Sequence, residues 1–303
     1  MAMFGQSIHS LAKEGKVKDY VGDFELENLF KSLTVPSRVK EKLNGKLFAS
    51  EAGNCARKNV ISSTIDLVET MEISGKFYTN VGQCIEEVFA ELLEHNSKLI
   101  SNSLRIYDDV KFVKEFNDNF ILYQNDVRIG FSGIIDLIVQ NNGELTLIDV
   151  KTCGELPEKV SNQYEKQILF YSAVTGIDNV AILYQSRNIK GSFSEPIDLR
   201  VIKVSTEYDK LLEVVTTAYF SKLCFENEIL PTKNEKYKKT VHCKYCNFSN
   251  FCYEGEALEL YPLIQDEKLE KELLIKAEEL AKKFLENRQN RFRLFYEKFL
   301  KGE

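Results

Sequence analysis

The chain has 303 residues, 44% of them hydrophobic, which is enough for one large core or two modest ones. Its charged fraction of 28% is ordinary for a globular protein, and no apolar run approaches the roughly 18 residues that span a bilayer. The formal net charge of −6 argues only weakly against a nucleic-acid partner, since a local basic patch matters more than the total. Because residues 1–16 hold no apolar signal-peptide core, we expect an intracellular, cytoplasmic protein that does not enter a membrane.

The N-terminal third of the chain is predicted to be mainly helical. Residues 1–50 are polar and carry no sharp motif, and residues 50–57 form a turn that leads into a helix. A longer helix is predicted over residues 75–96, where apolar side chains recur at helical spacing. Glu86 on this helix shares a face with apolar residues. Because a carboxylate on such a face needs a partner, Glu86 is a candidate functional residue.

The middle of the chain has the composition of a β-meander. Residues 104–152 are rich in Val, Ile, Phe and Tyr, with Asn- and Asp-rich turn signals between the apolar runs. Residues 130–139 and 145–150 are apolar on both faces, as expected of central strands that are covered on both sides. Between these two runs, the Asn-Asn-Gly sequence at 141–143 predicts a hairpin turn.

A helix is predicted from Pro157 to Gly176, because proline favours the first turn of a helix and glycine favours its end. Gln167 and Tyr171 lie one turn apart on its inward face. The next elements are two strands and two helices, at residues 179–185, 199–204, 208–227 and 269–284. This order of elements predicts one mixed sheet with helices on both faces.

Two carboxylates and a lysine come together in the predicted meander. Asp136 and Asp149 have 12 residues between them and flank the hairpin turn. Because side chains i and i+2 of a strand point to the same side, Asp149 and Lys151 face one site. Acidic oxygens bind Mg²⁺ or Mn²⁺, and a cation beside the attacked phosphate suits a metal-dependent phosphodiesterase. The alternative is two unrelated strand-end acids and a solvated lysine, but the agreement of strands, turn and following helix favours a site.

These residues resemble the motifs of the PD-(D/E)XK nuclease superfamily. The matching segments are Gly133-x-x-Asp136, Asp149-Val150-Lys151 and Gln167-x-x-x-Tyr171. The Gln-x-x-x-Tyr element is similar to that of the RecB-like branch, and residues 82–86 resemble the upstream helix motif of that branch. Glu86 stands where most RecB-like members carry His. The resemblance covers residues 82–171 and implies an α/β fold, with a restriction-endonuclease-like mixed β-sheet core flanked by helices.

The resemblance also implies a mechanism. One or two Mg²⁺ or Mn²⁺ ions are bound by Glu86, Asp136, Asp149 and the Val150 backbone carbonyl. Lys151 orients the attacking water or stabilises developing charge. Gln167 and Tyr171 position Lys151 or the DNA backbone. The implied catalytic residues are therefore Asp136, Asp149, Lys151, Glu86, Gln167 and Tyr171.

Four of the seven cysteines form a second pattern. Cys55 lies far upstream of a C-x2-C-x5-C segment formed by Cys243, Cys246 and Cys252. This arrangement resembles the iron–sulfur staple of the CRISPR-associated Cas-four exonucleases and of AddB-type nucleases. It implies a [4Fe–4S] cluster that joins the helical N-terminal and C-terminal additions. A Zn²⁺ site is the alternative, because zinc also accepts four cysteines and His242 stands beside Cys243.

The remaining cysteines and the basic residues receive weaker interpretations. We expect Cys84, Cys153 and Cys224 to be buried small hydrophobes. A lysine patch predicts contacts with DNA phosphates, with a solvated loop as the alternative; its members are Lys233, Lys236, Lys238, Lys239 and Lys244. The aromatic and basic segment at 288–301 could meet DNA or a partner, but packing on the chain's own core is the preferred reading.

We therefore expect a DNA nuclease, an exonuclease that acts on single-stranded or end-containing DNA, with endonuclease activity left open. Its role would lie in recombination and repair, phage DNA processing or CRISPR adaptation. The alternative is a non-catalytic DNA-binding subunit with the same fold and a zinc or iron–sulfur staple. Partners would include a helicase, an integrase or a recombinase, and oligomers are left open. The expected parts are helices at 1–74, the nuclease core at 75–228, the basic and cysteine segment at 229–255, and a helical tail at 256–303.

Overall fold

The computed structural model describes residues 34–40, 47–64, 67–95, 99–107, 111–114, 131–141, 144–187, 198–233, 243, 246, 248–249, 252 and 263–300. The chain divides into two compact units. The first contains Met1–Lys40 and Val68–Gln83, and the second contains Glu41–Leu67 and Cys84–Glu303. The four-part division expected from the sequence stays a prediction.

A two-stranded sheet of β1 (Thr34–Lys40) and β3 (Leu67–Glu72) belongs to the first unit. The expectation that residues 1–50 are helical is therefore wrong for the part of that range that the structure describes. Pro36 cannot lie in a helix interior, and the β-branched Val35 and Val39 favour a strand.

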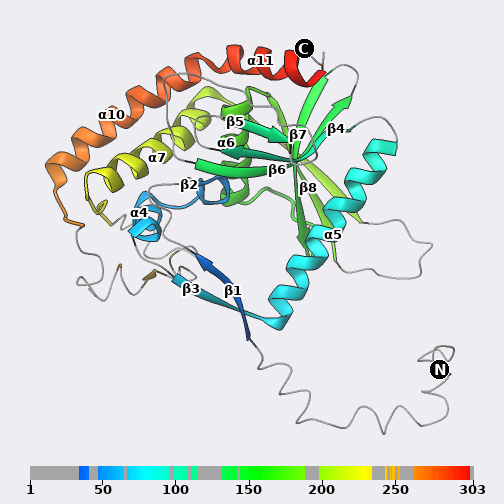
Figure 1. Ribbon diagram of the computed structural model, residues 1–303, viewed down its shortest axis with the longest axis horizontal. Helices are drawn as coiled ribbons and strands as arrows, with labels where there is room; N and C mark the ends of the chain where they lie inside the picture. Colours follow the sequence, from blue (N-terminus) through cyan, green and yellow to red (C-terminus); the bar gives the residue numbers. More distant parts are fainter. Residues whose placement is uncertain are drawn as a thin grey trace, which may run out of the picture. The chain divides into compact units, whose positions relative to one another are not determined.

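Seven strands form the sheet of the second unit, in the order β5-β4-β6-β7-β8-β9, with β2 paired to β6 outside that path (Figure 1). Their bounds are β2 Leu47–Phe48, β4 Leu99–Tyr107, β5 Lys111–Lys114, β6 Phe131–Asn141, β7 Glu144–Cys153, β8 Asn179–Ser186 and β9 Leu199–Val204. The β2–β6 and β7–β8 pairs are parallel and the other pairs are antiparallel, so the sheet is mixed. Asn141 pairs with Glu144, which confirms the predicted hairpin between β6 and β7.

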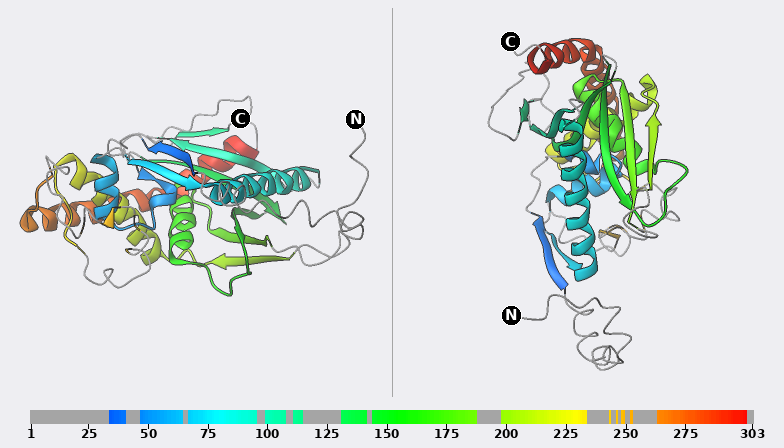
Figure 2. Two further views of the ribbon diagram at one scale, coloured as in Figure 1. Left: turned by 90° about the horizontal axis from the view of Figure 1, so that it is seen from below. Right: turned by 90° about the vertical axis from the view of Figure 1, so that its right-hand side faces the viewer.

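Helices cover both faces of this sheet (Figure 1, Figure 2). The helices are α4 Ala56–Thr64, α5 Ile73–His95, α6 Asn162–Thr175, α7 Tyr208–Glu226, α10 Glu267–Glu286 and α11 Arg288–Leu300, with a 3₁₀ turn at Ala49–Glu51. The larger apolar core lies on one face of β6, β7 and β8, and α6, α7 and α10 contribute to it. In this core α10 lies beside α7. The other face packs on the C-terminal half of α5, where Ala90 meets Leu137 and Val150. The predicted α/β fold, a mixed sheet with helices on both faces, is confirmed.

The helix that follows β7 begins later than the sequence predicts. Its N-cap is Ser161, whose hydroxyl oxygen accepts a hydrogen bond from the Tyr164 amide at 3.3 Å. Pro157 lies outside the helix, so its use as the start was wrong. A serine that satisfies a free amide of the first turn marks a helix start more strongly than a proline does. The predicted end is confirmed, since Gly176 caps α6 in the left-handed region at φ 79°.

Gly176→Ala is expected to lower the free energy of unfolding by at least about 1–2 kcal/mol, because an L residue is strained in the left-handed region. A Cβ there would also lie 2.6 Å from the Arg288 carbonyl oxygen and 2.7 Å from Phe292 Cβ. Urea denaturation measures the change. Gly154→Ala is the matched control, because a Cβ at Gly154 meets no atom within 4 Å. Equal stability of the two variants would contradict the prediction.

Two arginines fasten α11 to the C-terminal end of α6. Arg291 is only 3% exposed, and its guanidinium donates to the Ala173 carbonyl at 2.8 Å. Arg288 donates to the Ser172 carbonyl at 3.3 Å, and cations at this end of a helix interact favourably with its dipole. Arg288, Arg291 and the half-buried Phe292 thus pack on the chain's own core, as the preferred interpretation of this segment expects of them. The side chains of residues 294–296 and 298–301 lie outside the described part of the chain, and for them the interpretation stays a prediction. None of the helices that the structure describes is long and apolar enough to cross a membrane.

Candidate active site

The β6–β7 hairpin brings the two predicted aspartates together. Leu137 pairs with Ile148, so the next positions, Asp136 and Asp149, lie across from each other on adjacent strands. The Val150 amide donates to Asp136 Oδ2 at 2.7 Å, which holds the first carboxylate against the second strand. The local cause is the turn after Asn141, because it sets which residues of the two strands face each other.

Lys151 completes this cluster two residues after Asp149, as strand periodicity predicts. Its Nζ lies 2.6 Å from Asp149 Oδ2. The Asp149 side chain is 1% exposed and that of Lys151 is 21% exposed, so the ion pair is largely removed from water. Neither buried oxygen of Asp149 accepts a hydrogen bond from a described backbone amide or hydroxyl. The carboxylate therefore has unused acceptor capacity that a cation would satisfy.

Glu86 reaches the same cluster from α5. Burial raises the pKa of Glu86 to about 7, with Lys151 lowering it and Asp149 raising it. Burial also raises the pKa of Asp136, which Asp149 raises further. Burial lowers the pKa of Lys151, but the charges of Asp149 and Asp136 together raise it above its usual value. Three acids and one lysine therefore share one electrostatic environment, which is typical of a functional site.

The raised pKa of Glu86 predicts a pH-dependent stability of the metal-free protein. Between pH 4.5 and about 7 the folded state holds a proton that the unfolded state releases. The free energy of unfolding should therefore fall by roughly 1–2 kcal/mol as the pH rises through this window, after allowance for partial solvent screening. Urea denaturation in EDTA at pH 5, 6, 7 and 8 measures this fall.

Glu86→Gln should remove part of that fall. Glu91→Gln is its matched control, because Glu91 lies on the same helix and is exposed. The same pH dependence in wild type and Glu86→Gln would contradict the assignment of Glu86 to the buried acidic cluster.

Gln167 and Tyr171 support the strand that carries Asp136. The Tyr171 hydroxyl donates to the Ile134 carbonyl at 2.6 Å, and Gln167 hydrogen-bonds to the Tyr171 side chain. A Cβ at Gly133 would lie 3.0 Å from the Tyr171 ring, so the glycine leaves room for it. The hydrogen bonds that the structure describes for Gln167 and Tyr171 join these two residues to each other and to β6, and none of them reaches Lys151. Their expected role at Lys151 or at the DNA backbone stays a prediction.

The sequence pattern gave Tyr164 no role, although it lies on the same inward stripe of α6. In the structure, Lys151 Nζ lies 5.1 Å from the centroid of the Tyr164 ring. The available signal was its spacing, because Tyr164 precedes Gln167 by three residues and therefore shares its helix face. Sequence reasoning missed it because a tyrosine on an inward stripe is usually a core residue.

The acidic cluster suits a divalent cation by its chemistry. Carboxylate oxygens and a backbone carbonyl are the ligands that Mg²⁺ and Mn²⁺ prefer, and Glu86, Asp136, Asp149 and Val150 offer them. In the part of the chain that the structure describes, no three His, Cys, Asp or Glu side chains already stand as the ligands of a single ion. The assignment of these ligands thus rests on shared burial, on charge and on the spare acceptor capacity of the Asp149 carboxylate beside Lys151.

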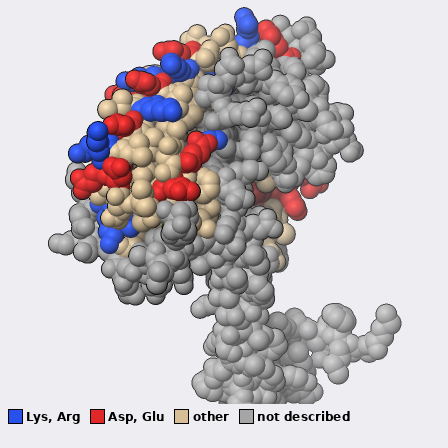
Figure 3. Space-filling view, turned by 60° about the vertical axis from the view of Figure 1, so that its left-hand side comes forward, with Lys and Arg blue, Asp and Glu red and all other residues tan. Residues whose placement is uncertain are grey.

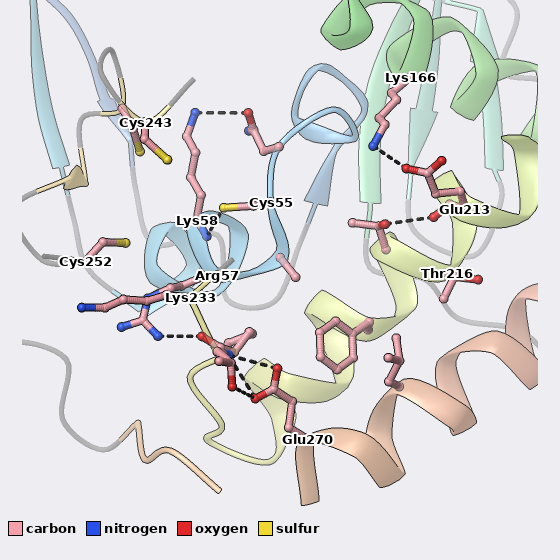
Figure 4. A pocket seen from close by; sticks show the side chains of 18 of the residues that line it. Cys55, Arg57, Lys58, Lys166, Glu213, Thr216, Lys233, Cys243, Cys252 and Glu270 are labelled. Carbon is pink, nitrogen blue, oxygen red and sulfur yellow. Dashed lines mark hydrogen bonds and ion pairs between the residues drawn. The ribbon is translucent and has the colours of Figure 1, made fainter. Parts of the chain in front are cut away.

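The four predicted cluster cysteines line one cavity of about 310 Å³ (Figure 4). Cys55 immediately precedes α4, and its Sγ accepts a hydrogen bond from the Lys58 amide at 3.4 Å. Burial raises the pKa of the Cys55 thiol, and the charges of Cys246, Cys252 and Cys243 raise it further. All four are free thiols that line this cavity despite their long separation in sequence. Among the described residues no three of them already stand as the ligands of one ion, so their role in a metal centre stays a prediction.

The other three cysteines differ from one another. Cys224 is buried, as predicted, and Cys153 is half-buried. Cys84 is exposed, so the prediction that it is a buried hydrophobe was wrong. Cys84 lies on α5, one face of which packs on the sheet. The spacing of apolar residues did not show that Cys84 lies on a different face of this helix.

The predicted lysine patch is only partly covered by the structure. Lys233 lines the cysteine cavity (Figure 4), whereas Lys236, Lys238, Lys239 and Lys244 lie outside the described residues, as does His242. On the face formed by α7 and α10, Lys and Arg side chains alternate with Asp and Glu (Figure 3). Pairs such as Lys282–Glu278 at 2.6 Å account for part of this mixture. The described part of this face is therefore mixed in charge and does not form a basic surface.

Comparisons with known proteins identify one family. A model described as the PD-(D/E)XK nuclease superfamily matches residues 3–253. No curated protein matches the chain. One solved structure, described as "Crystal structure of SSO0001", is similar at 14% sequence identity and a TM-score of 0.41, over 80% of this chain and 98% of that one. The family match also confirms the predicted restriction-endonuclease-like mixed β-sheet core.

Proposed function

Because the chain belongs to the PD-(D/E)XK nuclease superfamily, we propose that it is a metal-dependent DNA nuclease whose active centre is the Glu86–Asp136–Asp149–Lys151 cluster. The observation that carries the proposal is the buried ion pair between Asp149 and Lys151, which lies beside Asp136. A binding module has no need to bury like charges next to a lysine, because such burial costs stability. For this reason we rank the non-catalytic DNA-binding subunit second, behind the nuclease.

Each residue has a role in phosphodiester hydrolysis. Nucleases of this superfamily generally use Mg²⁺ or Mn²⁺, which supplies Lewis-acid activation of water and neutralises phosphate charge. Glu86, Asp136, Asp149 and the Val150 carbonyl would hold the ion. The Val150 amide keeps Asp136 in place, and Lys151 presents a positive charge where negative charge develops on the phosphate oxygens. Gln167 and Tyr171 maintain the position of β6, and their contact with the DNA backbone is part of the proposal.

The proposed substrate is single-stranded DNA or DNA with free ends, cleaved as an exonuclease. The resemblance to RecB-like enzymes supports this choice. Single-stranded DNA labelled separately at its 5′ and 3′ ends, with a circular control, tests it in the presence of Mn²⁺ or Mg²⁺. Metal-dependent release of one label before the other would support an exonuclease and give its polarity. Cleavage of the circle would add endonuclease activity, and no cleavage with either metal would favour the DNA-binding subunit.

A [4Fe–4S] centre on Cys55, Cys243, Cys246 and Cys252 is proposed as a structural staple, with Zn²⁺ as the alternative. The basic residues of α4 support an anionic centre in this cavity. Arg57 is 6% exposed, yet its described partner is the neutral Pro231 carbonyl at 2.6 Å, and its Nε has no hydrogen-bond partner. Lys58 contacts the neutral side chain of Asn54. Burial raises the pKa of the Cys246 thiol, and the charge of Lys58 offsets part of that rise. A buried cation without a carboxylate is costly, and four thiolates would compensate it.

The biological setting is proposed only in outline. Recombination and repair, phage DNA processing and CRISPR adaptation all require trimming of DNA ends. The sequence contains no G-x-x-x-x-G-K-[ST] nucleotide-binding loop, so unwinding of a duplex would require a helicase partner. Pull-down with the purified, metal-loaded protein would identify a helicase, integrase or recombinase, and light scattering would give the oligomeric state.

A further inference from the structure

Tyr164 is the aromatic neighbour of Lys151, and no sequence motif assigns it a role. The Lys151 Nζ lies 5.1 Å from the centroid of the Tyr164 ring. A cation within about 6 Å of a ring face is attracted by the negative potential of that face. The close contacts that the structure describes for the Lys151 ammonium are the Asp149 carboxylate and the Tyr164 ring, and the charges of Asp136 and Glu86, which are also proposed metal ligands, act on it as well.

The position of the Tyr164 ring is determined from two sides. On one side the start of α6 fixes its backbone, because the Tyr164 amide donates to the Ser161 hydroxyl and the Glu165 amide to the Ser161 carbonyl at 2.9 Å. On the other side its ring packs against Tyr184, with centroids 6.5 Å apart and ring planes 52° apart. Tyr184 is 3% exposed and lies opposite Lys151 in the parallel β7–β8 pairing. The ring is therefore held by a capped helix and by the strand next to Lys151.

The two contacts of Lys151 respond differently to a bound cation. Asp149 is a proposed metal ligand, and a carboxylate that binds Mg²⁺ or Mn²⁺ offers less negative charge to the ammonium. The lysine stem is flexible, and the ammonium is mostly removed from water, so it needs a second partner. The Tyr164 ring face carries no charge for the metal to neutralise, and its attraction persists when the metal is bound.

We propose that Tyr164 is a positioning residue, whose ring face holds the Lys151 ammonium at the acidic cluster while Asp149 is engaged with the metal. This inference rests on the proposed nuclease function. It requires the aromatic face of Tyr164 and not its hydroxyl group. A phenylalanine at position 164 should therefore preserve the positioning of Lys151, because it keeps the aromatic ring. A leucine there should lose it.

The kinetic test compares Tyr164→Phe with Tyr164→Leu. Tyr164→Phe should retain a kcat close to that of the wild type. Tyr164→Leu should lower kcat by roughly 5- to 30-fold with little change in KM, the rate equivalent of about 1–2 kcal/mol. In a Lys151→Ala background, Tyr164→Leu should cause no further loss, because the residue acts through the lysine. An equal loss in both backgrounds, or equal losses in the Phe and Leu variants, would overturn the proposal.

A second readout does not depend on activity. The ring current of Tyr164 should shift the ε-methylene protons of Lys151 upfield in the NMR spectrum, with the signal assigned by its absence in Lys151→Ala. The shift should persist in Tyr164→Phe and after addition of Mg²⁺, and it should disappear in Tyr164→Leu. If Mg²⁺ abolishes the shift in the wild type, the proposal is wrong even when DNA is cleaved. If the shift persists but no DNA is cleaved, the proposed nuclease function fails while the contact stands.

Discussion

Lys151→Ala is expected to reduce the rate of DNA cleavage by roughly 100- to 1000-fold or more, the usual cost of removing a group that stabilises transition-state charge. Loss of its ammonium removes the positive charge next to Asp149, which lies at the proposed active centre. The fold should persist, because burial already raises the pKa of Asp149, and protonation can neutralise the carboxyl that the substitution leaves unpaired. Release of labelled nucleotides measures the rate, and circular dichroism checks the fold.

Lys210→Ala is the matched control for this substitution. Lys210 lies on α7 and pairs with Glu165 at 2.9 Å, in an ion pair outside both the acidic cluster and the cysteine cavity. This variant should cleave DNA at close to the wild-type rate. Unaltered cleavage by Lys151→Ala would exclude the proposed active centre, whereas a loss of both activity and folding would mean that the ion pair serves mainly stability.

If the proposed metal centre is present, Cys55→Ser is expected to remove it and to lower the free energy of unfolding by about 3 kcal/mol or more, because the binding energy of a structural metal is part of the folding energy. Cys55 lies at the start of α4, and this helix packs on α7, so loss of the centre removes a link between distant parts of the chain. Iron, sulfide and zinc content after oxygen-free purification, together with thermal unfolding, measure the effect.

Cys84→Ser is the control, since Cys84 is exposed and belongs to no cysteine group. It should keep the wild-type metal content and stability. A brown wild-type protein with four irons per chain would support the [4Fe–4S] cluster. A colourless protein with stoichiometric zinc would support the Zn²⁺ site instead. A metal-free wild-type protein with the stability of Cys55→Ser would refute the staple.

Much of the candidate site could be predicted, because the periodicity of strands and helices shows which side chains share a face. Strand alternation placed Asp149 and Lys151 on one side, and the turn after Asn141 made Asp136 their neighbour. Helical spacing likewise placed Gln167 and Tyr171 one above the other on α6. These arrangements depend on residues that are close in sequence, so the chain itself specifies them.

The errors arose where competing local signals had to be ranked. Pro157 and Ser161 both mark helix starts, and only the hydrogen bond to Ser161 decides between them. The residues around Pro36 looked polar and helical, but a partner strand, β3, makes them a strand. Burial of Cys84 could not be read from composition, since it depends on which face of α5 meets the sheet.

By itself, the sequence determined the mixed sheet, the Asp136–Asp149–Lys151 cluster and the grouping of three of the four cysteines that line the cavity, because repeated local spacing fixes which side chains share a face. Only the tertiary structure decided that Glu86 joins the acids, that Cys55 meets the distant cysteines in one cavity, and that the Tyr164 ring lies against Lys151. Each of these contacts joins separate elements. Their geometry follows from how the whole core packs, and no local period of the chain encodes that packing.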